Sequence, residues 1–232
     1  MTSGETPSRA TDGGEAAGVT GVVVVVHGGK SVSFEPTTAV QPAVLRMIPL
    51  ARAIRRALRG SGAVVLRPRF QLRGWNGEQA LPVPDLSAIL DDIGSTFGPV
   101  PVVLVGHSMG ARAAIRVAGR PAVLAVAGLA PWLPPGEPVG QLAGRRVLLV
   151  QGSTDGITRP EDTWAYADRA RSVAEVTAIE IRNGDHAMLR RAGLWHRVAA
   201  EFVCSVLHLA GRGGQVAEVL RIGAADPRRV VL

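Results

Sequence analysis

The sequence contains little cysteine and few aromatic residues, and each scarcity limits what the protein can be. Cys204 is the only cysteine among 232 residues, so no disulfide can form within the chain. Aromatic residues make up 4% of the chain, whereas hydrophobic residues make up 47%. The core must therefore be built mainly from Val, Leu, Ala and Ile, and the chain is long enough to bury a sizeable one.

Long apolar segments are missing as well. The first eighteen residues lack the apolar stretch of a secretory signal, and no run approaches the length needed to cross a bilayer. We therefore expect a soluble, cytoplasmic protein without a membrane span.

Charge of one sign is in excess, because the formal net charge is +7 at neutral pH. Nearly all the basic residues are arginines, and Lys30 is the only lysine. Such a balance is found in proteins that bind nucleic acid or anionic membranes. Here the arginines are scattered or occur in short pairs, with no basic run interleaved with aromatic residues. We attribute the excess to a coding preference for arginine, and we expect no nucleic-acid partner.

Short apolar runs alternate with helical patterns along most of the chain. Runs rich in β-branched residues are typical of strands buried on both faces of a sheet. The predicted strands cover residues 21–29, 62–70, 100–108, 122–132, 145–153 and 175–183. The predicted helices cover residues 49–62, 83–98, 109–119, 159–172 and 193–210. This alternation predicts an α/β fold with a mostly parallel sheet and helices on both of its faces.

The same patterns divide the chain into three parts. Residues 1–18 have no periodicity and are rich in Gly, Ser, Thr, Ala and Glu, which predicts disorder. Residues 19–210 form a single α/β domain. Residues 211–232 carry a weak helical patch and polar punctuation, and the patterns do not place this C-terminal tail.

The stretch "VVLVGHSMGARAA" places Ser108 between two glycines, at the junction of a predicted strand and a predicted helix. Alone, the pattern G-x-S-x-G is weak and could be an ordinary glycine-rich turn. In this context it predicts a tight, strained strand-to-helix turn that exposes a nucleophilic serine, with the flanking glycines avoiding clashes with neighbouring strand or helix. The Met109 N–H then lies at the start of the helix, where it can bind a developing oxyanion.

A nucleophilic serine needs a base, and the base needs a carboxylate that fixes its tautomer. His186 is the best base among the five histidines, since it follows the last predicted strand in a glycine-containing loop. The His107 side chain would point away from the Ser108 hydroxyl. Asp155 follows another strand and is the predicted acid, whereas Asp185 is too close in sequence to His186 to face its Nδ1. The order Ser108, Asp155, His186 is the one expected for this type of fold.

The second oxyanion donor should come from the loop after the first strand, where "HGGK" offers unobstructed backbone N–H groups, and we favour Gly29. Four residues are candidates for substrate contact, although packing is an equally good account of the hydrophobic ones. They are His107, Trp75, Trp132 and Met188. No carboxylate or cysteine spacing supports a metal site, so we predict no metal and no cofactor.

These motifs together resemble the α/β-hydrolase superfamily over residues 21–210. The matching segments are "HGG" (27–29), "GHSMG" (106–110), "GSTDGITRP" (152–160) and "GDH" (184–186). The resemblance implies a Ser–His–Asp hydrolase, commonly an esterase, lipase or thioesterase. Many relatives insert a helical cap before the strand at 145–153, but here the segment 133–144 is too short for one. We therefore expect a cap-less fold with an open or shallow site, roofed by residues 30–42 and 71–84.

The expected reaction is cleavage of a small-molecule carboxylic ester or thioester through an acyl-enzyme. One alternative is an acyltransferase or thioesterase acting on a carrier-bound acyl group, whose phosphates the arginines would meet. A second is a non-catalytic binding protein on a hydrolase scaffold, and a third is a perhydrolase or haloperoxidase using the same triad. The sequence leaves the acyl chain length and the oligomeric state open.

Overall fold

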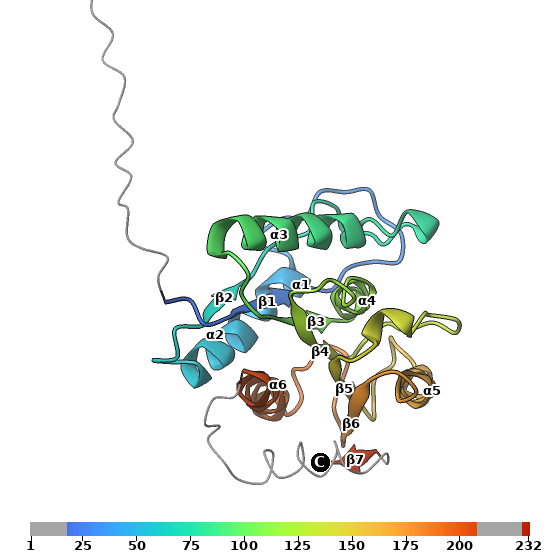
Figure 1. The fold of residues 1–232 in the computed structure, drawn as a ribbon. Helices are drawn as coiled ribbons and strands as arrows, with labels where there is room; N and C mark the ends of the chain where they lie inside the picture. Colours follow the sequence, from blue (N-terminus) through green and yellow to red (C-terminus); the bar gives the residue numbers. More distant parts are fainter. Residues whose placement is uncertain (1–17, 208–228) are drawn as a thin grey trace, which may run out of the picture.

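A computed structural model of the chain describes residues 18–207 and 229–232 (Figure 1). The described residues form a seven-stranded parallel sheet with the order β2-β1-β3-β4-β5-β6-β7. The strands are β1 (Val22–Val26), β2 (Val64–Leu66), β3 (Val102–His107), β4 (Val123–Leu129), β5 (Arg146–Gly152), β6 (Glu175–Ile181) and β7 (Val230–Val231). Positions 1–17 and 208–228 lie outside the described residues. They include the N-terminal residues predicted to be disordered and most of the predicted C-terminal tail.

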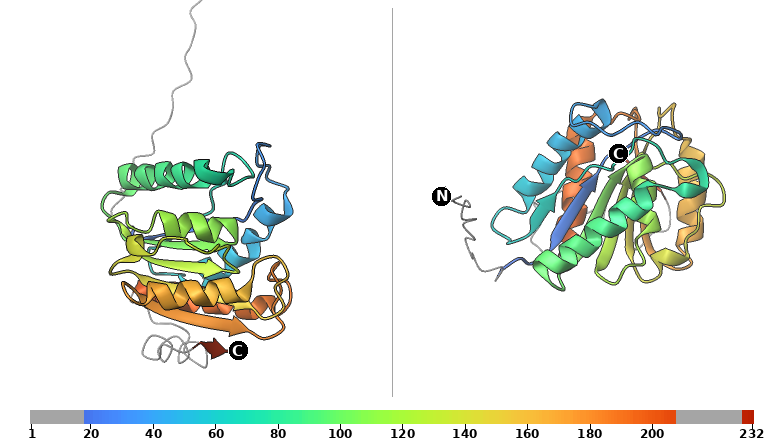
Figure 2. Two further views of the ribbon diagram at one scale, coloured as in Figure 1. Left: turned by 90° about the vertical axis from the view of Figure 1, so that its right-hand side faces the viewer. Right: turned by 90° about the horizontal axis from the view of Figure 1, so that it is seen from above.

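Helices cover both faces of this sheet. They are α1 (Pro42–Leu45), α2 (Met47–Ala57), α3 (Pro82–Phe97), α4 (Met109–Arg116), α5 (Pro160–Ala170) and α6 (Ala192–Val206), with short 3-10 turns at Gly77–Gln79 and Gly140–Leu142. Figures 1 and 2 show α2 and α6 on one face and α3, α4 and α5 on the other. The predicted α/β-hydrolase fold, with its parallel sheet between two helical layers, is confirmed.

The five consecutive valines of β1 explain why this sequence forms a central strand. Successive side chains point to opposite faces of a sheet. Val23 and Val25 accordingly pack with α2 and α6, whereas Val22, Val24 and Val26 pack with the helices of the other face. All five are buried, so a strand in this position must be apolar at every residue.

Strand β7 and the short helix α1 are elements that the sequence patterns missed. The strand pairs with β6 in parallel through Ile179–Val230 and Glu180–Val231. Two residues at the edge of a sheet are too few for an alternation pattern to stand out. The end of the predicted tail therefore belongs to the sheet.

The connection between β4 and β5 contains no cap. Residues 130–145 hold only the 3-10 turn Gly140–Leu142, as the short sequence segment predicted. Because all strands run in parallel, the loops that follow them gather at one edge of the sheet (Figure 2, right). We call the connections 27–41, 67–81, 153–159 and 182–191 the edge loops. They surround the end of β3, where Ser108 follows.

Candidate active site

Ser108 occupies the turn between β3 and α4 in a strained backbone conformation. Its φ of 53° and ψ of −116° are unusual for a residue with a side chain. Its N–H donates a hydrogen bond to the Leu129 carbonyl (3.0 Å), and its carbonyl accepts one from the Trp132 N–H (3.3 Å). The turn is thus held by the neighbouring strand and the segment that follows it. We call this turn, residues 106–110, the elbow.

The two glycines of "GHSMG" are required by close backbone approach. A Cβ on Gly106 would lie 2.5 Å from the backbone of Ala111, and a Cβ on Gly110 would collide with the His27 carbonyl oxygen. Both contacts are with backbone, which cannot move aside as a flexible side chain can. The strand, the turn and the helix can therefore pack this tightly only with glycine at both positions.

His186 and Asp155 are brought into direct contact at the same edge. The His186 Nδ1 lies 2.8 Å from Asp155 Oδ2, although the two residues are 31 positions apart. The Asp155 side chain is fully buried, whereas that of His186 is 16% exposed. An imidazole that is held on its inner nitrogen and open on its outer side suits a base that is oriented by a carboxylate.

The Asp155 carboxylate is satisfied by several further donors. Its Oδ1 accepts hydrogen bonds from the Ile157 and Thr158 N–H groups (2.8 and 2.9 Å), and its Oδ2 accepts from Gln151 Nε2 and Thr158 Oγ1 (both 2.8 Å). Burial acts to raise the pKa of Asp155, but the hydrogen bonds from His186, Thr158 and Ile157 outweigh it and hold the pKa at about 2. The carboxylate is therefore ionised at neutral pH and can accept a hydrogen bond from His186 Nδ1–H.

His107 ties the His186 loop to the elbow. Its Nε2 lies 2.8 Å from the His186 carbonyl oxygen, and the two imidazole rings have centroids 5.0 Å apart. His107 is 1% exposed, and burial, reinforced by the nearby His186, lowers its pKa to about 3. The ring is therefore neutral at pH 7, with Nε2–H donating to the carbonyl. Its Nδ1 has no hydrogen-bond partner among the described residues.

The three predicted triad residues thus meet at one edge, but they are not all joined by hydrogen bonds. Asp155 bonds to His186, and the neighbour of Ser108 bonds to the backbone of His186. Within the described part of the chain, no hydrogen bond connects the Ser108 hydroxyl to the imidazole. Catalytic hydrogen bonds are often long or poorly aligned in the absence of substrate, and they tighten when the substrate binds.

The two predicted oxyanion donors lie on segments that touch each other. A Cβ on Gly29 would come within 2.5 Å of the Met109 side chain. Met109 is the first residue of α4, where backbone N–H groups have no partner inside the helix. Among the described hydrogen bonds, none uses the N–H of Gly29 or Met109, whereas the Lys30 N–H donates to the Arg73 carbonyl (2.8 Å). Lys30 is therefore excluded as an oxyanion donor, and Gly29 stays available.

The loops expected to roof the site do join each other. Lys30 and Gly74 form a parallel bridge, and Pro36 and Leu72 form an antiparallel one. The Asn76 side chain adds hydrogen bonds to the backbone of Ser33. The β1–α1 and β2–α3 connections are therefore one ordered unit beside Ser108.

The degree of burial distinguishes residues with a packing role from candidates for substrate contact. Trp75 and Met188 are 3% and 2% exposed and pack in the two halves of the core, which favours a packing role for both. The nearly complete burial of His107 likewise favours its contact with the His186 backbone over contact with a substrate. Trp132 is only partly buried and stays the better candidate for a wall of the site.

A buried charge cluster behind the site was not found from the sequence. The Arg112 guanidinium stacks over Trp75 and Trp132, with its central carbon 4.0 and 4.6 Å from the ring centroids. The two indoles meet edge to face at 6.0 Å. Glu137, whose side chain is 1% exposed, accepts hydrogen bonds from Arg112 Nε (2.7 Å) and from Arg116 Nε. The cluster fastens the loop after β4 to the helix that carries the elbow, over a sequence separation that local patterns do not report.

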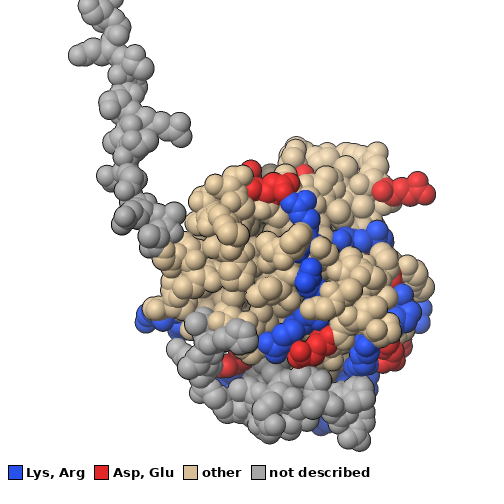
Figure 3. Space-filling model, viewed as in Figure 1, with Lys and Arg blue, Asp and Glu red and all other residues tan. Residues whose placement is uncertain are grey.

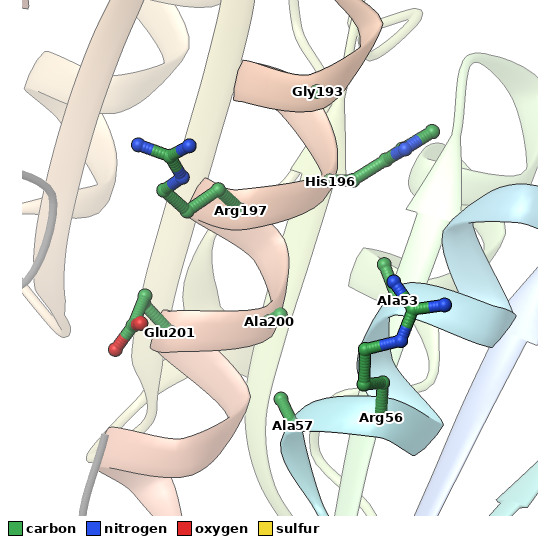
Figure 4. A pocket seen from close by; sticks show the side chains of 8 residues that line it. All are labelled: Ala53, Arg56, Ala57, Gly193, His196, Arg197, Ala200 and Glu201. Carbon is green, nitrogen blue, oxygen red and sulfur yellow. The ribbon is translucent and has the colours of Figure 1, made fainter. Parts of the chain in front are cut away.

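A cavity of about 480 Å³ lies away from these residues, in the groove between α2 and α6 (Figure 4). It is lined by Ala53, Arg56, Ala57, Gly193, His196, Arg197, Ala200 and Glu201. None of the predicted site residues contributes to it. Four of its eight lining residues are alanine or glycine.

Metal-binding clusters and helices that could span a membrane are both absent from the described residues. Residues 18–207 and 229–232 contain no group of three or more His, Cys, Asp or Glu side chains arranged to hold a metal ion. Among the helices that the structure describes, none combines the length and apolarity needed to cross a membrane.

A parallel sheet between two helical layers, with a serine elbow and an Asp–His pair at its carboxyl edge, defines the α/β-hydrolase class of fold. A sequence model that represents the alpha/beta hydrolase family matches residues 23–230 of this chain. The chain belongs to this family. A comparison with curated proteins gives no match.

Solved structures with this fold cover most of the chain at low sequence identity. An alpha-beta serine hydrolase homologue from Coxiella burnetii matches 79% of this chain and 85% of its own, with 19% identity and a TM-score of 0.58. The esterase domain of a Rhodothermus marinus protein matches 82% and 89%, with 19% identity and a TM-score of 0.58. A serine hydrolase without a lid from Xanthomonas campestris matches 81% and 82%, with 20% identity and a TM-score of 0.53. At these identities the likeness establishes the fold alone.

Proposed function

We propose that the protein is a serine hydrolase that cleaves a small-molecule carboxylic ester or thioester. The observation that carries the proposal is the Asp155–His186 hydrogen bond at the sheet edge where the strained Ser108 elbow emerges. Strain in a non-glycine residue persists only where the surroundings enforce it, and it concentrates at functional sites. Solved structures with the same fold include an esterase domain and serine hydrolases, which agrees with this reaction class.

In the proposed reaction, the Ser108 oxygen attacks the substrate carbonyl while His186 Nε2 accepts the hydroxyl proton. Asp155 stabilises the resulting imidazolium, which is why its low pKa matters. The N–H groups of Met109 and Gly29 bind the tetrahedral oxyanion, and each contributes about 3 kcal/mol to the transition state. His186 then protonates the leaving group, an acyl-enzyme forms, and water releases the acid by the same steps. The reaction needs no metal and no cofactor.

His107 acts in this scheme as a positioning residue. It precedes the nucleophile directly, and its Nε2–H holds the carbonyl of the proposed base. Its low pKa keeps the ring neutral, and because the His186 carbonyl oxygen can only accept, the ring's one proton lies on Nε2. A shift of the imidazole by about 1 Å would cost on the order of 10²-fold in rate.

A carrier-bound thioester is the second candidate substrate. It is favoured by Arg67 and Arg69, which line a cavity of about 320 Å³ with Ala39, Val44 and Pro68 at the carboxyl edge of the sheet. Phosphate groups on such a carrier would meet these two guanidinium groups. The chemistry at Ser108 is the same for both substrates.

The decisive experiment is an ester panel of graded acyl length, run on the wild type and on Ser108→Ala, with p-nitrophenyl acetate compared against acyl-CoA. We expect turnover by the wild type and a loss of at least about 10³-fold in the variant. A preference for acyl-CoA over simple esters would favour the carrier-bound substrate. Equal turnover by both proteins, or no turnover of any ester by folded wild type, would refute the proposed reaction.

A further inference from the structure

Exposed apolar side chains are concentrated at the carboxyl edge of the sheet. The described residues include eight large hydrophobic side chains that are exposed, and six of them lie in the edge loops or on α1. These six, which we call the apolar rim, are Val32, Phe34, Val40, Leu45, Ile157 and Leu189. Four of the rim side chains are more than 65% exposed, namely Val32 (67%), Val40 (75%), Ile157 (76%) and Leu189 (71%). The other two exposed hydrophobics are Leu124 and Val231, which lie on strands and outside the rim.

The rim does not look like a random scatter. Single exposed hydrophobic residues are normal on a protein surface, but a group on one face marks a surface that contacts something else. The rim residues come from three separate connections and from α1, and these surround the end of β3 where Ser108 lies. Three of them, Val32, Phe34 and Val40, lie on the β1–α1 loop, which is tied to the β2–α3 loop by bridges and hydrogen bonds.

Positive charge accompanies the rim. The four edge loops carry eight basic residues and four acidic ones. The basic residues are Lys30, Arg67, Arg69, Arg73, Arg159, Arg182, Arg190 and Arg191, and the acidic ones are Glu35, Glu78, Asp155 and Asp185. One base and one acid offset each other directly, because Glu35 pairs with Arg73, and the Asp155 carboxylate bonds to His186. Eight basic residues against four acidic ones give the edge loops beside the apolar rim a net positive charge.

Away from the edge loops the two signs of charge lie side by side in several places, although residues 42–66 carry five arginines and no acidic residue. On the face drawn in Figure 3, acidic side chains lie beside a band of basic ones. At the amino ends of β5 and β6, Arg146 pairs with Glu175 (3.3 Å). By contrast, Arg67 and Arg69 have no acidic partner within 4 Å among the described residues, and they flank the 320 Å³ cavity. Arg67 Nη1 donates one hydrogen bond to the Val44 carbonyl (3.5 Å), and neither guanidinium is paired with a described carboxylate, so both can bind phosphate oxygens.

We propose that the apolar rim and its basic residues dock the protein on an anionic lipid surface. Apolar side chains that enter the acyl boundary and cations that face phosphate groups are the two components of interfacial binding. A second copy of the chain is a poor occupant, because two edges with the same excess of positive charge would repel each other. Docking in this orientation would turn Ser108 and His186 toward the lipid, so a substrate could enter from the surface.

Vesicle sedimentation with the full-length protein tests the proposal. The probes are vesicles of phosphatidylcholine alone and vesicles of phosphatidylcholine and phosphatidylglycerol in equal amounts. We expect binding to the anionic vesicles to be at least tenfold tighter than to the neutral ones, and to weaken as salt is added. Ser108→Ala should bind like the wild type, so the outcome does not depend on the proposed reaction.

Matched variants identify the surface that binds. The double variant Phe34→Ser, Val40→Ser should bind anionic vesicles at least about tenfold more weakly, whereas Leu124→Ser, at the amino end of β4, should bind as the wild type does. Arg69→Gln should weaken binding, and the exposed Arg59→Gln beyond the end of α2 should not. All substituted side chains are exposed, so circular dichroism should report unchanged folding.

Three outcomes would overturn the proposal. One is that the folded wild type binds neither kind of vesicle. Another is that the rim and control variants weaken binding equally. The third is that the rim substitutions abolish a dimer in solution, which would identify the rim as a contact between copies of the chain.

Discussion

Replacing Asp155 by asparagine should both destabilise the protein and remove most of its activity. The pKa of Asp155 is held at about 2 against an ordinary value of 3.8, and this difference corresponds to about 2.5 kcal/mol of stability at neutral pH. An amide also places an NH₂ group opposite a donor, either His186 Nδ1–H or the N–H groups of Ile157 and Thr158. We therefore expect the free energy of unfolding at pH 7 to fall by about 2–4 kcal/mol.

The stabilisation by the Asp155 carboxylate should depend on pH in a defined direction. Because the folded-state pKa is depressed, the stabilisation is fully present above pH 3.8 and is lost as the pH falls through about 2. The difference in unfolding free energy between wild type and Asp155→Asn should shrink over that window. Ester hydrolysis should drop by on the order of 10⁴-fold, because an asparagine favours the wrong tautomer of His186.

Denaturant unfolding at several pH values and steady-state ester hydrolysis measure the two effects. Asp185→Asn is the matched control: it is adjacent to His186, but its carboxylate accepts hydrogen bonds from the N–H groups of Leu189 and Arg190. We expect this control to retain activity within a few-fold of wild type. If Asp155→Asn were as stable and as active as wild type, or if Asp185→Asn lost as much activity, the assignment of Asp155 would be wrong.

Three further predictions rest on other parts of the structure. Glu137→Ala should lower the free energy of unfolding by about 3–5 kcal/mol in denaturant titrations, because it leaves Arg112 charged and without its buried partner; an effect below about 1 kcal/mol would contradict the buried pair. Gly110→Ala should destabilise the protein by about 1–3 kcal/mol and lower ester turnover, because the new Cβ meets the His27 carbonyl; wild-type melting and turnover would contradict the close approach. Because the pKa of His107 is lowered to about 3, its stabilising contribution is complete above pH 6.5 and should fall by about 1.4 kcal/mol per pH unit between pH 6.5 and 3. A His107→Gln variant should lose that part of the pH dependence while keeping a donor for the His186 carbonyl, so it should retain more turnover than His107→Phe. Identical pH profiles for wild type and variant would refute the buried, neutral ring.

The sequence was most informative where one strong local pattern decides the structure. Six of the seven described strands are runs of β-branched and apolar residues, and all six were predicted within a few residues of their observed bounds. The helix boundaries were less accurate: the helix predicted to extend to position 62 ends at Ala57, just before Gly60 and Gly62 adopt positive φ values. The elbow was recognisable because its glycines and serine are adjacent in the chain.

Contacts between distant residues could not be predicted in the same way. Nothing near Glu137 in sequence indicates that two arginines of α4, 25 and 21 positions away, surround its carboxylate. His107 was expected to point away from the Ser108 hydroxyl, but its hydrogen bond to the backbone of a residue 79 positions downstream could not be inferred. Such pairings depend on how the loops pack at the sheet edge, and many arginines in this chain are equivalent candidates by sequence alone.

Covalent labelling with a fluorophosphonate, followed by mass spectrometry of the labelled peptide, tests most directly whether Ser108 is the activated nucleophile. We predict one adduct on Ser108 in the wild type, much slower labelling in His186→Ala, and no labelling in Ser108→Ala. An adduct on another residue, or a folded wild-type protein that the probe does not modify, would contradict the account.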